Sequence, residues 1–226
     1  MYKKNNAAVL WTGGKDSCLA LHEAHLRGHQ IKNLITLVPH EPDFLAHPIG
    51  FMKLQSEALQ IPHITIEISE PYKTNYVNTF LSLKEKYFIE TLITGDIDEI
   101  EGHSNMVKEC AEEVNMEIFF PLWKKNRKEI INKFSEYNFQ WIFSLVKQPH
   151  FTNDWVGKKF SQSAYNDLLE LEKHGVDICG EKGEYHSLVL DSELFKKRIS
   201  IDKFSKKEKK SMHYISIEKI SLKDKL

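Results

Sequence analysis

The chain has 226 residues, and its 31 lysines and arginines against 32 aspartates and glutamates give a formal net charge of −1. With 41% hydrophobic and 28% charged residues, the composition is that of a globular protein and excludes a disordered, collagen-like or coiled-coil chain. The balanced charge creates no overall positive field that would attract a phosphate backbone, which excludes a bulk nucleic-acid binder and leaves only a local basic patch open.

In the first half of the chain, short apolar runs alternate with segments of helical periodicity. Strands are expected at Ala7–Trp11, Lys32–Val38, His63–Ile68, Thr91–Thr94 and Glu117–Phe120. Helices are expected at Lys15–Arg27, Gly50–Gln60, Tyr76–Tyr87 and Ser104–Val114. Strands separated by helices predict right-handed βαβ units, and therefore an α/β fold with a parallel sheet.

The second half changes character at Pro121-Leu122-Trp123, which we interpret as a junction. Helices are expected at Arg127–Tyr137 and Ser161–His174, and strands at Gln140–Val146, Ser187–Leu190, Arg198–Ile201 and His213–Ile220. This pattern predicts a smaller α+β domain from about residue 121 onward. We interpret the basic stretch Lys203–Lys210 as a solvated turn in preference to a phosphate contact.

Processing and targeting signals are not apparent in the sequence. No apolar run approaches the ~20 residues of a membrane helix, and the apolar segment Ala7–Trp11 is too short for the core of a signal peptide. The widely spaced Cys18, Cys110 and Cys179 form no C-x-x-C pair, so neither a zinc site nor a disulfide framework is indicated. We therefore expect a cytoplasmic protein without membrane association.

The segment between the first strand and the first helix has the composition of an anion-binding loop. Gly13 and Gly14 let backbone N–H groups approach an anion without a Cβ in the way, and the start of the helix adds unsatisfied donors and a positive dipole end. The remaining donors of the loop are Thr12, Ser17 and Lys15. These groups predict a site for a diphosphate or triphosphate, although a tight turn with a solvated Lys-Asp pair would have the same composition.

Two common nucleotide motifs do not fit this loop. The first glycine position of the P-loop holds Val9, and the residue after Lys15 is Asp16 in place of serine or threonine. The dinucleotide pattern G-x-G-x-x-G fails because no third glycine follows Gly14.

The loop and five further blocks resemble known families. Thr12–Ser17 resembles the S-G-G-x-D-S loop of the N-type ATP pyrophosphatases, with Thr12 keeping the hydroxyl of the usual serine. The other blocks resemble, in order, those of the diphthine–ammonia ligase family. They are His47–Pro62, Ile93–Ile97, Pro121–Trp123, Asp154–Lys158 and Gly180–Asp191. The chain is therefore identified as a member of the diphthine–ammonia ligase family, within the PP-loop superfamily.

The resemblance implies a fold and a place for the ligand. It implies a Rossmann-like, HUP-type sheet of five parallel strands in the order 3-2-1-4-5, followed by the smaller α+β domain. Residues 1–120 would form the nucleotide-binding domain and residues 121–226 a substrate-side domain. Ligands of open parallel sheets bind where the strand connections diverge, so Gly95 and Asp96 after the fourth strand would adjoin the loop. The backbone of Val38 would contact adenine.

The resemblance also implies the reaction. A substrate carboxylate attacks the α-phosphorus of ATP, pyrophosphate leaves, and ammonia converts the acyl-adenylate to an amide with release of AMP. The implied cofactors are ATP and Mg²⁺. The ATP-binding residues would be Thr12, Gly13, Gly14, Lys15, Asp16, Ser17, Val38 and Gly95. The catalytic residues would be Lys15, Asp16, Asp96, Glu181, Glu184 and His186, with Asp16 and Asp96 also serving as metal ligands.

Within that set, Glu181 and Glu184 would bind ammonium and accept its proton, while His186 would act as a base or a carboxylate ligand. Plainer interpretations exist for these residues. Asp96 would also suit a helix N-cap, and the two glutamates a surface turn before a strand. We expect Cys179 to be a small buried residue in preference to a nucleophile, and Cys18 likewise.

The implied acceptor is diphthine on elongation factor 2, with free ammonia as nitrogen donor because residue 2 is Tyr and no glutaminase segment is seen. The family's R-x-R-V-E-like stretch corresponds here to residues 104–109, where Met106 and Lys108 replace the arginine and the acidic residue. This departure leaves open a homologue that acts on a small carboxylate. A tRNA-modifying ATP pyrophosphatase and a non-catalytic nucleotide-binding protein are two competing hypotheses. A homodimer is compatible with the sequence.

Overall fold

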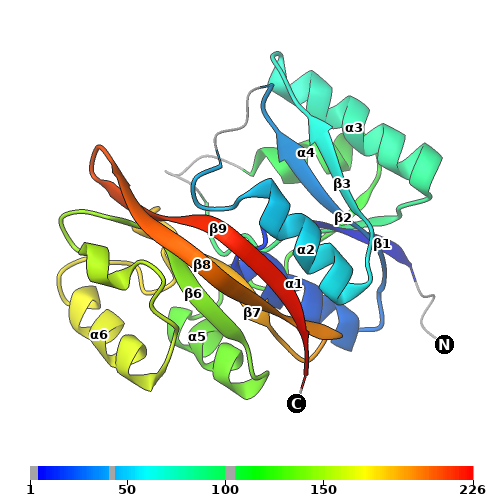
Figure 1. Cartoon of the computed structure of the whole chain (residues 1–226). Coiled ribbons are helices and arrows are strands. Elements are labelled where there is room, and N and C mark those ends of the chain that lie inside the picture. The colour runs from blue at the N-terminus through cyan, green and yellow to red at the C-terminus, as the bar shows by residue number, and fades with distance from the viewer. Residues whose placement is uncertain (1–4, 41–43, 100–104, 226) are drawn as a thin grey trace. The chain divides into compact units, whose positions relative to one another are not determined.

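The computed structural model describes residues 5–40, 44–99 and 105–225 (Figure 1). Internal contacts divide the described residues into two units. The first unit takes those within Met1–Thr12, Asp16–Asp43 and Ile61–Lys124, and the second those within Gly13–Lys15, Phe44–Gln60 and Lys125–Leu226. The contacts thus group Gly13–Lys15 and Phe44–Gln60 with the later part of the chain. The division predicted from the sequence, at residue 120, keeps each domain continuous along the chain and so assigns both segments to the first domain.

The first unit contains a five-stranded parallel sheet in the order β3-β2-β1-β4-β5, which confirms the predicted fold. Its strands are β1 (Asn6–Leu10), β2 (Gln30–Val38), β3 (His63–Glu67), β4 (Thr91–Ile93) and β5 (Glu117–Phe119). Its helices are α1 (Lys15–Leu26), α3 (Tyr72–Tyr87) and α4 (Met106–Glu113). All of these elements were predicted, with bounds that differ by a few residues.

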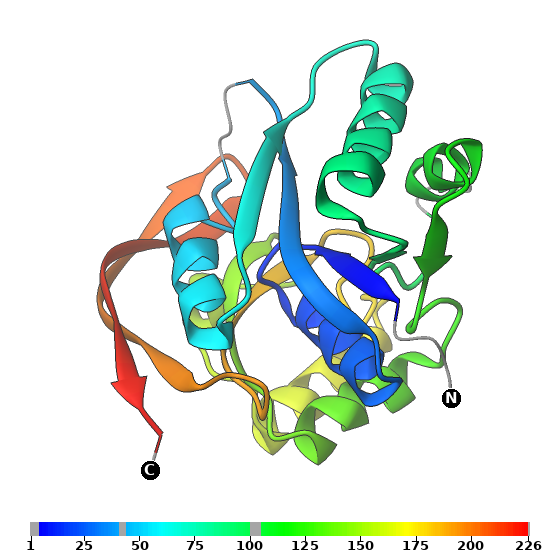
Figure 2. The same ribbon diagram turned by 90° about the vertical axis from the view of Figure 1, so that its right-hand side faces the viewer.

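The central strand β1 marks the point where the chain changes direction across the sheet. Val9 of β1 pairs with Leu34 of β2 on one side and with Ile93 of β4 on the other. Right-handed crossovers therefore place α1 on the face opposite to α3 and α4, an arrangement that can be followed in Figure 2. Such a reversal is where open parallel sheets bind their ligands.

The core of the first unit lies between the sheet and the pair α3 and α4. Phe80 and Leu83 of α3 and Cys110 of α4 are buried against Ala8 and Leu92 of the sheet. The helix α4 begins at an N-cap, Asn105, whose side chain accepts a hydrogen bond of 3.0 Å from the amide of Lys108. This packing fixes the sheet on which the loop after β1 is built.

The second unit contains a four-stranded antiparallel sheet in the order β7-β6-β9-β8. Its strands are β6 (Gln140–Lys147), β7 (Tyr185–Asp191), β8 (Lys197–Lys209) and β9 (Met212–Asp224). Its helices are α2 (Ile49–Leu59), α5 (Arg127–Glu136), α6 (Gln162–Glu172) and the short 3₁₀ helix Asn153–Trp155. The long hairpin of β8 and β9 curls around α2, against which both strands pack (Figure 2).

Aromatic side chains form much of the core of the second unit. Trp141 of β6 stacks on Phe160 with ring centroids 4.5 Å apart and planes inclined by 11°. Tyr185 of β7 and Phe143 of β6 pack in the same cluster, with centroids 4.9 Å apart. The start of β7, which carries candidate site residues, is therefore anchored in a rigid core.

The basic stretch Lys203–Lys210 is not a solvated turn, and this prediction was wrong. β8 continues to Lys209 and pairs with β9 along its length, so the turn comprises only Lys210 and Ser211. The backbone groups of the stretch are satisfied by the ladder, while its charged side chains stay exposed and pair across the strands, as in Lys203 with Glu218 at 2.6 Å. A strand with both faces exposed needs no alternation of apolar and polar residues. The sequence of this segment therefore lacks the signal from which a strand is predicted.

Candidate functional site

Within the first unit, two hydroxyls meet where β1 leads into α1. The Oγ1 of Thr12 lies 3.2 Å from the Oγ of Ser17. The preceding residue is fixed by the neighbouring strand: the amide of Trp11 donates to the carbonyl of Ile35 at 2.7 Å, and the carbonyl of Trp11 accepts from Thr36 Oγ1 at 2.7 Å. The two predicted hydroxyl donors are thus brought together at the carboxyl end of β1.

The segment after β4 touches the first turn of α1, as the strand order predicted. A Cβ on Gly95 would lie 2.5 Å from the carbonyl carbon of Asp16 and 2.7 Å from the amide nitrogen of Ser17. Both are backbone atoms that cannot turn aside, so only glycine permits this approach. Gly95 therefore sets the separation between the end of β4 and the helix start.

Asp96 follows directly, and its Oδ2 accepts a 2.7 Å hydrogen bond from the side-chain amide of Asn105. Asp16 and Asp96 are both half-buried and lie on segments whose backbones are in contact. Mg²⁺ prefers oxygen ligands and is often held by one or two carboxylates together with substrate phosphates. These two carboxylates fit such a partial set. Over the described residues no group of three or more metal-binding side chains occurs, so an ion here would need phosphate oxygens as further ligands.

Within the second unit, the carbonyl of Gly13 is held by two donors. It accepts hydrogen bonds from Gln55 Nε2 at 2.9 Å and from the amide of Val189 at 3.1 Å. Gly13 has a φ of +73°, and a Cβ there would lie 2.3 Å from Gln55 Oε1. Because the peptide unit is planar and trans, fixing this carbonyl also fixes the opposite direction of the Gly14 N–H.

Gln55 is a site residue that the sequence analysis did not single out. Its side chain is fully buried and also donates to the carbonyl of Val189 at 2.9 Å, so α2 and β7 hold the loop jointly. A signal was present in the sequence, because Gln55 stands on the apolar face of α2. The other members of that face are Phe51, Met52, Ala58 and Leu59. A polar residue at such a position needs a buried partner.

Lys15 is buried, with 2% of the residue exposed. Its Nζ donates to the carbonyl of Cys179 and lies 5.2 Å from the centre of the Tyr185 ring. Its amide donates to Ser187 Oγ at 3.0 Å. Within the second unit, Lys15 is therefore held by Cys179, which precedes β7, and by residues of β7 itself. Its role toward phosphate stays a prediction.

Glu184 organises the turn that precedes β7. Its Oε1 accepts from the amide of Asp177 at 2.7 Å and its Oε2 from the amide of Lys182 at 3.0 Å. Asp177 in turn accepts from Arg127 Nε at 3.1 Å, while Glu181 is half-buried. Both carboxylate oxygens of Glu184 thus accept hydrogen bonds from backbone amides. Such bonds are typical of a residue that stabilises a turn, as the alternative interpretation of the two glutamates expects. An additional role toward ammonia stays a prediction for both glutamates.

His186 lies beside a second histidine, His47. The Nε2 of His47 and the Nδ1 of His186 are 3.4 Å apart, and the rings meet edge to face. Burial lowers the pKa of His186 from 6.5 to about 4, and the nearby cations Lys15 and Lys147 act in the same direction. His186 is therefore neutral at neutral pH. Its ring can accept a hydrogen bond, while the lowered pKa makes it a weak base. His47, which lies in the first block that resembles the family, was not singled out as a site residue.

The remaining predicted residues lie as follows. The carbonyl of Val38, at the end of β2, accepts from the amide of Ile68 at 2.7 Å, so it takes part in strand pairing. Its contact with adenine stays a prediction. Cys18 and Cys179 are buried, and burial, with the charge of Asp16 as a smaller cause, raises the pKa of Cys18 well above its usual value. A buried neutral thiol is a poor nucleophile.

Comparisons with known proteins agree on one family. Residues 5–117 match the model of the diphthamide synthase N-terminal domain, and residues 126–222 that of the diphthamide synthase C-terminal domain. The diphthine–ammonia ligase of Bos taurus is 30% identical over 222 residues, which cover 86% of this chain and 82% of that protein. The enzyme of the same name from Mus musculus is 29% identical over 220 residues, and that from Homo sapiens 28% over 222, with the same coverage.

A solved chain described as a predicted subunit of a tRNA methyltransferase from Methanocaldococcus jannaschii also aligns with this chain. Its TM-score is 0.46 at 14% identity, covering 84% of this chain and 98% of that chain. A likeness of this strength carries no argument about function. In the described part of the chain, no helix is both long and apolar enough to cross a membrane.

Proposed function

The chain belongs to the diphthamide synthase family, and on that premise we propose that it is a ligase that forms a carbon–nitrogen bond. In the proposed reaction, the carboxylate of diphthine is converted to an amide with ammonia, and ATP is cleaved to AMP and pyrophosphate. The observation that carries the proposal is the loop Thr12–Ser17. It stands at the carboxyl end of β1, at the reversal point of the sheet, with Gly95 against the first turn of α1.

In this proposal the loop binds the phosphates of ATP. The N–H groups of the loop and the start of α1 supply donors and a positive dipole end for the phosphates. The hydroxyls of Thr12 and Ser17, 3.2 Å apart, supply two more donors. Gln55 acts by fixing the carbonyl of Gly13, which orients the following amide. Val38 would contact adenine through the groups that strand pairing leaves available.

We assign Lys15 a double task. Its positive charge lowers the energy of the negative charge that develops on the departing pyrophosphate, because a preorganised cation in a buried site acts strongly. Its hydrogen bond to the Cys179 carbonyl holds the loop in the conformation that binds the nucleotide. The residues that would hold Mg²⁺ are Asp16 and Asp96, and the ion would neutralise phosphate charge during adenylation.

For the second step we propose that Glu181, Glu184 and His186 serve the nitrogen donor. Ammonium must lose a proton before it can attack the acyl-adenylate. We assign the acceptance of that proton to Glu181 and Glu184. The neutral ring of His186 would accept a hydrogen bond from the nitrogen donor, because its lowered pKa makes it a weak base. Glu184 keeps the turn in place through the amides of Asp177 and Lys182, and its carboxylate charge also attracts ammonium. Residues 1–120 would thus carry nucleotide binding and residues 121–226 the substrate side.

The acceptor proposed from the names of the relatives is diphthine. Elongation factor 2 as the carrier of diphthine is what the resemblance of the sequence to the family implies. Met106 and Lys108 stand where the family has an arginine and an acidic residue, which makes the acceptor the part of the proposal that most needs a direct test. The use of ATP and a modified factor is consistent with action in the cytoplasm, and a homodimer remains a further proposal.

The test supplies the purified protein with ATP, Mg²⁺, ammonium and elongation factor 2 that carries diphthine. We expect equal amounts of AMP and pyrophosphate and a loss of the carboxylate from the factor, and unmodified factor serves as the control. Release of ADP and phosphate would reject the adenylation mechanism. If a small carboxylic acid supported turnover while the diphthine-bearing factor did not, the mechanism would hold but the acceptor would be wrong.

A further inference from the structure

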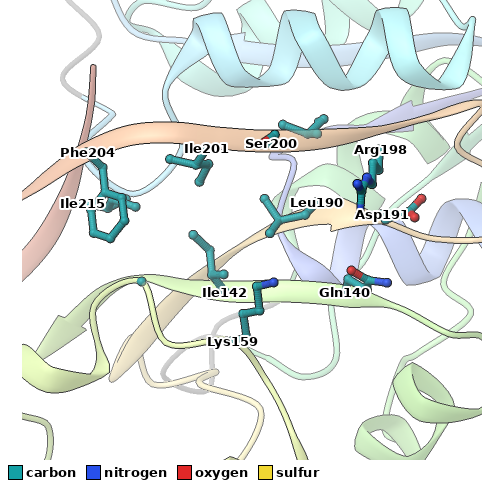
Figure 3. A pocket seen from close by; sticks show the side chains of 12 residues that line it. Gln140, Ile142, Lys159, Leu190, Asp191, Arg198, Ser200, Ile201, Phe204 and Ile215 are labelled. Carbon is teal, nitrogen blue, oxygen red and sulfur yellow. The ribbon is translucent and has the colours of Figure 1, made fainter. Parts of the chain in front are cut away.

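The second unit has a cavity of about 260 Å³ inside its antiparallel sheet (Figure 3). It opens because β6 pairs with β9 only over Leu145, Val146 and Lys147, beyond which the two strands separate. The space between them is lined by residues of β6, β7, β8 and β9. None of the residues proposed above for ATP or ammonia lines this cavity.

The inner wall of the cavity is aliphatic. Ile142, Leu190 and Ile201 point into the space between β6 and β8 in Figure 3. Ile142 and Leu190 are 3% and 8% exposed, and Ile215 of β9, at 2%, lies at the end near Phe204. A wall of this kind favours an apolar ligand body, because transferring apolar surface from water into it is favourable.

The rim carries two cations. Arg198 of β8 and Lys159 both line the cavity and both keep their charged ends accessible. Over residues 5–40, 44–99 and 105–225 neither side chain takes part in an ion pair, whereas the acidic residue of the rim, Asp191, is paired with Lys225 at 2.7 Å. The neutral polar residues Gln140 and Ser200 complete the rim. The uncompensated charge at the cavity is therefore positive.

We propose that this cavity binds a small carboxylate whose apolar body enters between β6 and β8 while its charged group meets Arg198 and Lys159. An apolar cavity of about 150 Å³ holds one benzene ring, so about 260 Å³ suits a ring with a short tail or a chain of roughly eight carbons. The guanidinium of Arg198 can donate two parallel hydrogen bonds to a carboxylate, a geometry that suits the planar fork of this side chain.

The probe for this proposal is octanoate, titrated into the full-length protein by calorimetry and by NMR of the isoleucine methyl groups. Octanamide has the same shape without the charge, and acetate has the charge without the chain. We expect octanoate to bind at least about tenfold more tightly than either, with shifts at the methyls of Ile142, Ile201 and Ile215.

Charge variants locate the anion. Arg198→Gln and Lys159→Gln are surface substitutions that leave the core intact, and each should weaken octanoate binding about tenfold. Lys207→Gln, which removes an exposed lysine of β8 outside the cavity lining, is the matched control and should leave binding unchanged.

Three results would overturn the proposal: no octanoate binding up to about 1 mM, equal binding of octanoate and octanamide, or equal effects of Arg198→Gln and Lys207→Gln. The measurement involves no ATP, ammonium or elongation factor, so its failure would leave the proposed ligase function untouched, and failure of the ligase test would leave this site untouched.

Discussion

Replacing Gly95 with alanine tests whether the end of β4 must touch the start of α1 for ATP to bind. The added Cβ would lie 2.5 Å from the carbonyl carbon of Asp16, 2.7 Å from its oxygen and 2.7 Å from the amide nitrogen of Ser17. None of these atoms belongs to a flexible side chain, so the variant relieves the overlap only by moving one backbone segment away from the other.

The size of that movement follows from the distances. Ordinary van der Waals contact for such a Cβ begins near 3.4 Å, so the closest pair must separate by about 0.9 Å, which is 3.4 Å less 2.5 Å. Overpacking of this size costs about 1–3 kcal/mol. A displacement near 1 Å at a reacting centre costs up to about 100-fold in rate. We therefore expect a modest loss of stability and a large loss of ATP-dependent turnover.

The assay compares Gly95→Ala with Gly50→Ala by chemical unfolding, calorimetric titration of ATP and pyrophosphate release. A Cβ on Gly50, in the first turn of α2, meets nothing within 4 Å, so that control should be neutral or up to about 1 kcal/mol more stable. If Gly95→Ala bound ATP as tightly as the unmodified protein, the close approach would have no part in nucleotide binding and the site would be wrongly assigned.

Three further variants probe other parts of the site. Gln55→Leu removes the buried donor that bonds the carbonyls of Gly13 and Val189, so the free energy of unfolding should fall by about 1–3 kcal/mol and ATP affinity should decrease. Unchanged unfolding curves would contradict this role of Gln55. The pKa of His186 is about 4 in the folded state and 6.5 in the unfolded state, so the contribution of His186 to the free energy of unfolding is fully present above pH 6.5 and falls by at most about 3 kcal/mol toward pH 4. In denaturation measurements over this pH range, His186→Gln should lack this fall. If the pH curves of the variant and the unmodified protein were parallel, the prediction would be refuted. Asp96→Asn should lower Mg²⁺-dependent pyrophosphate release about 100-fold or more, whereas Asp98→Asn should not, and equal losses would deny Asp96 a metal role.

The amino-acid sequence alone was enough to locate the elements and the loop. Apolar runs and helical periodicity are properties of neighbouring residues, so the five parallel strands could be placed along the chain from these patterns. The loop Thr12–Ser17 was found for the same reason, because glycine, hydroxyl and charge stand next to one another along the chain. The family resemblance then supplied the strand order, which the structure confirmed.

How the side chains are used depends on the tertiary fold. The hydrogen bond of Lys15 with Ser187 spans 172 positions and that of Gln55 with Val189 spans 134, and no local pattern encodes which of many distant groups will meet. The extension of β8 to Lys209 likewise depends on its pairing with β9, which satisfies the backbone of a charged stretch that looked like a turn. Local periodicity reports burial, whereas a buried polar group takes its partner from the fold around it.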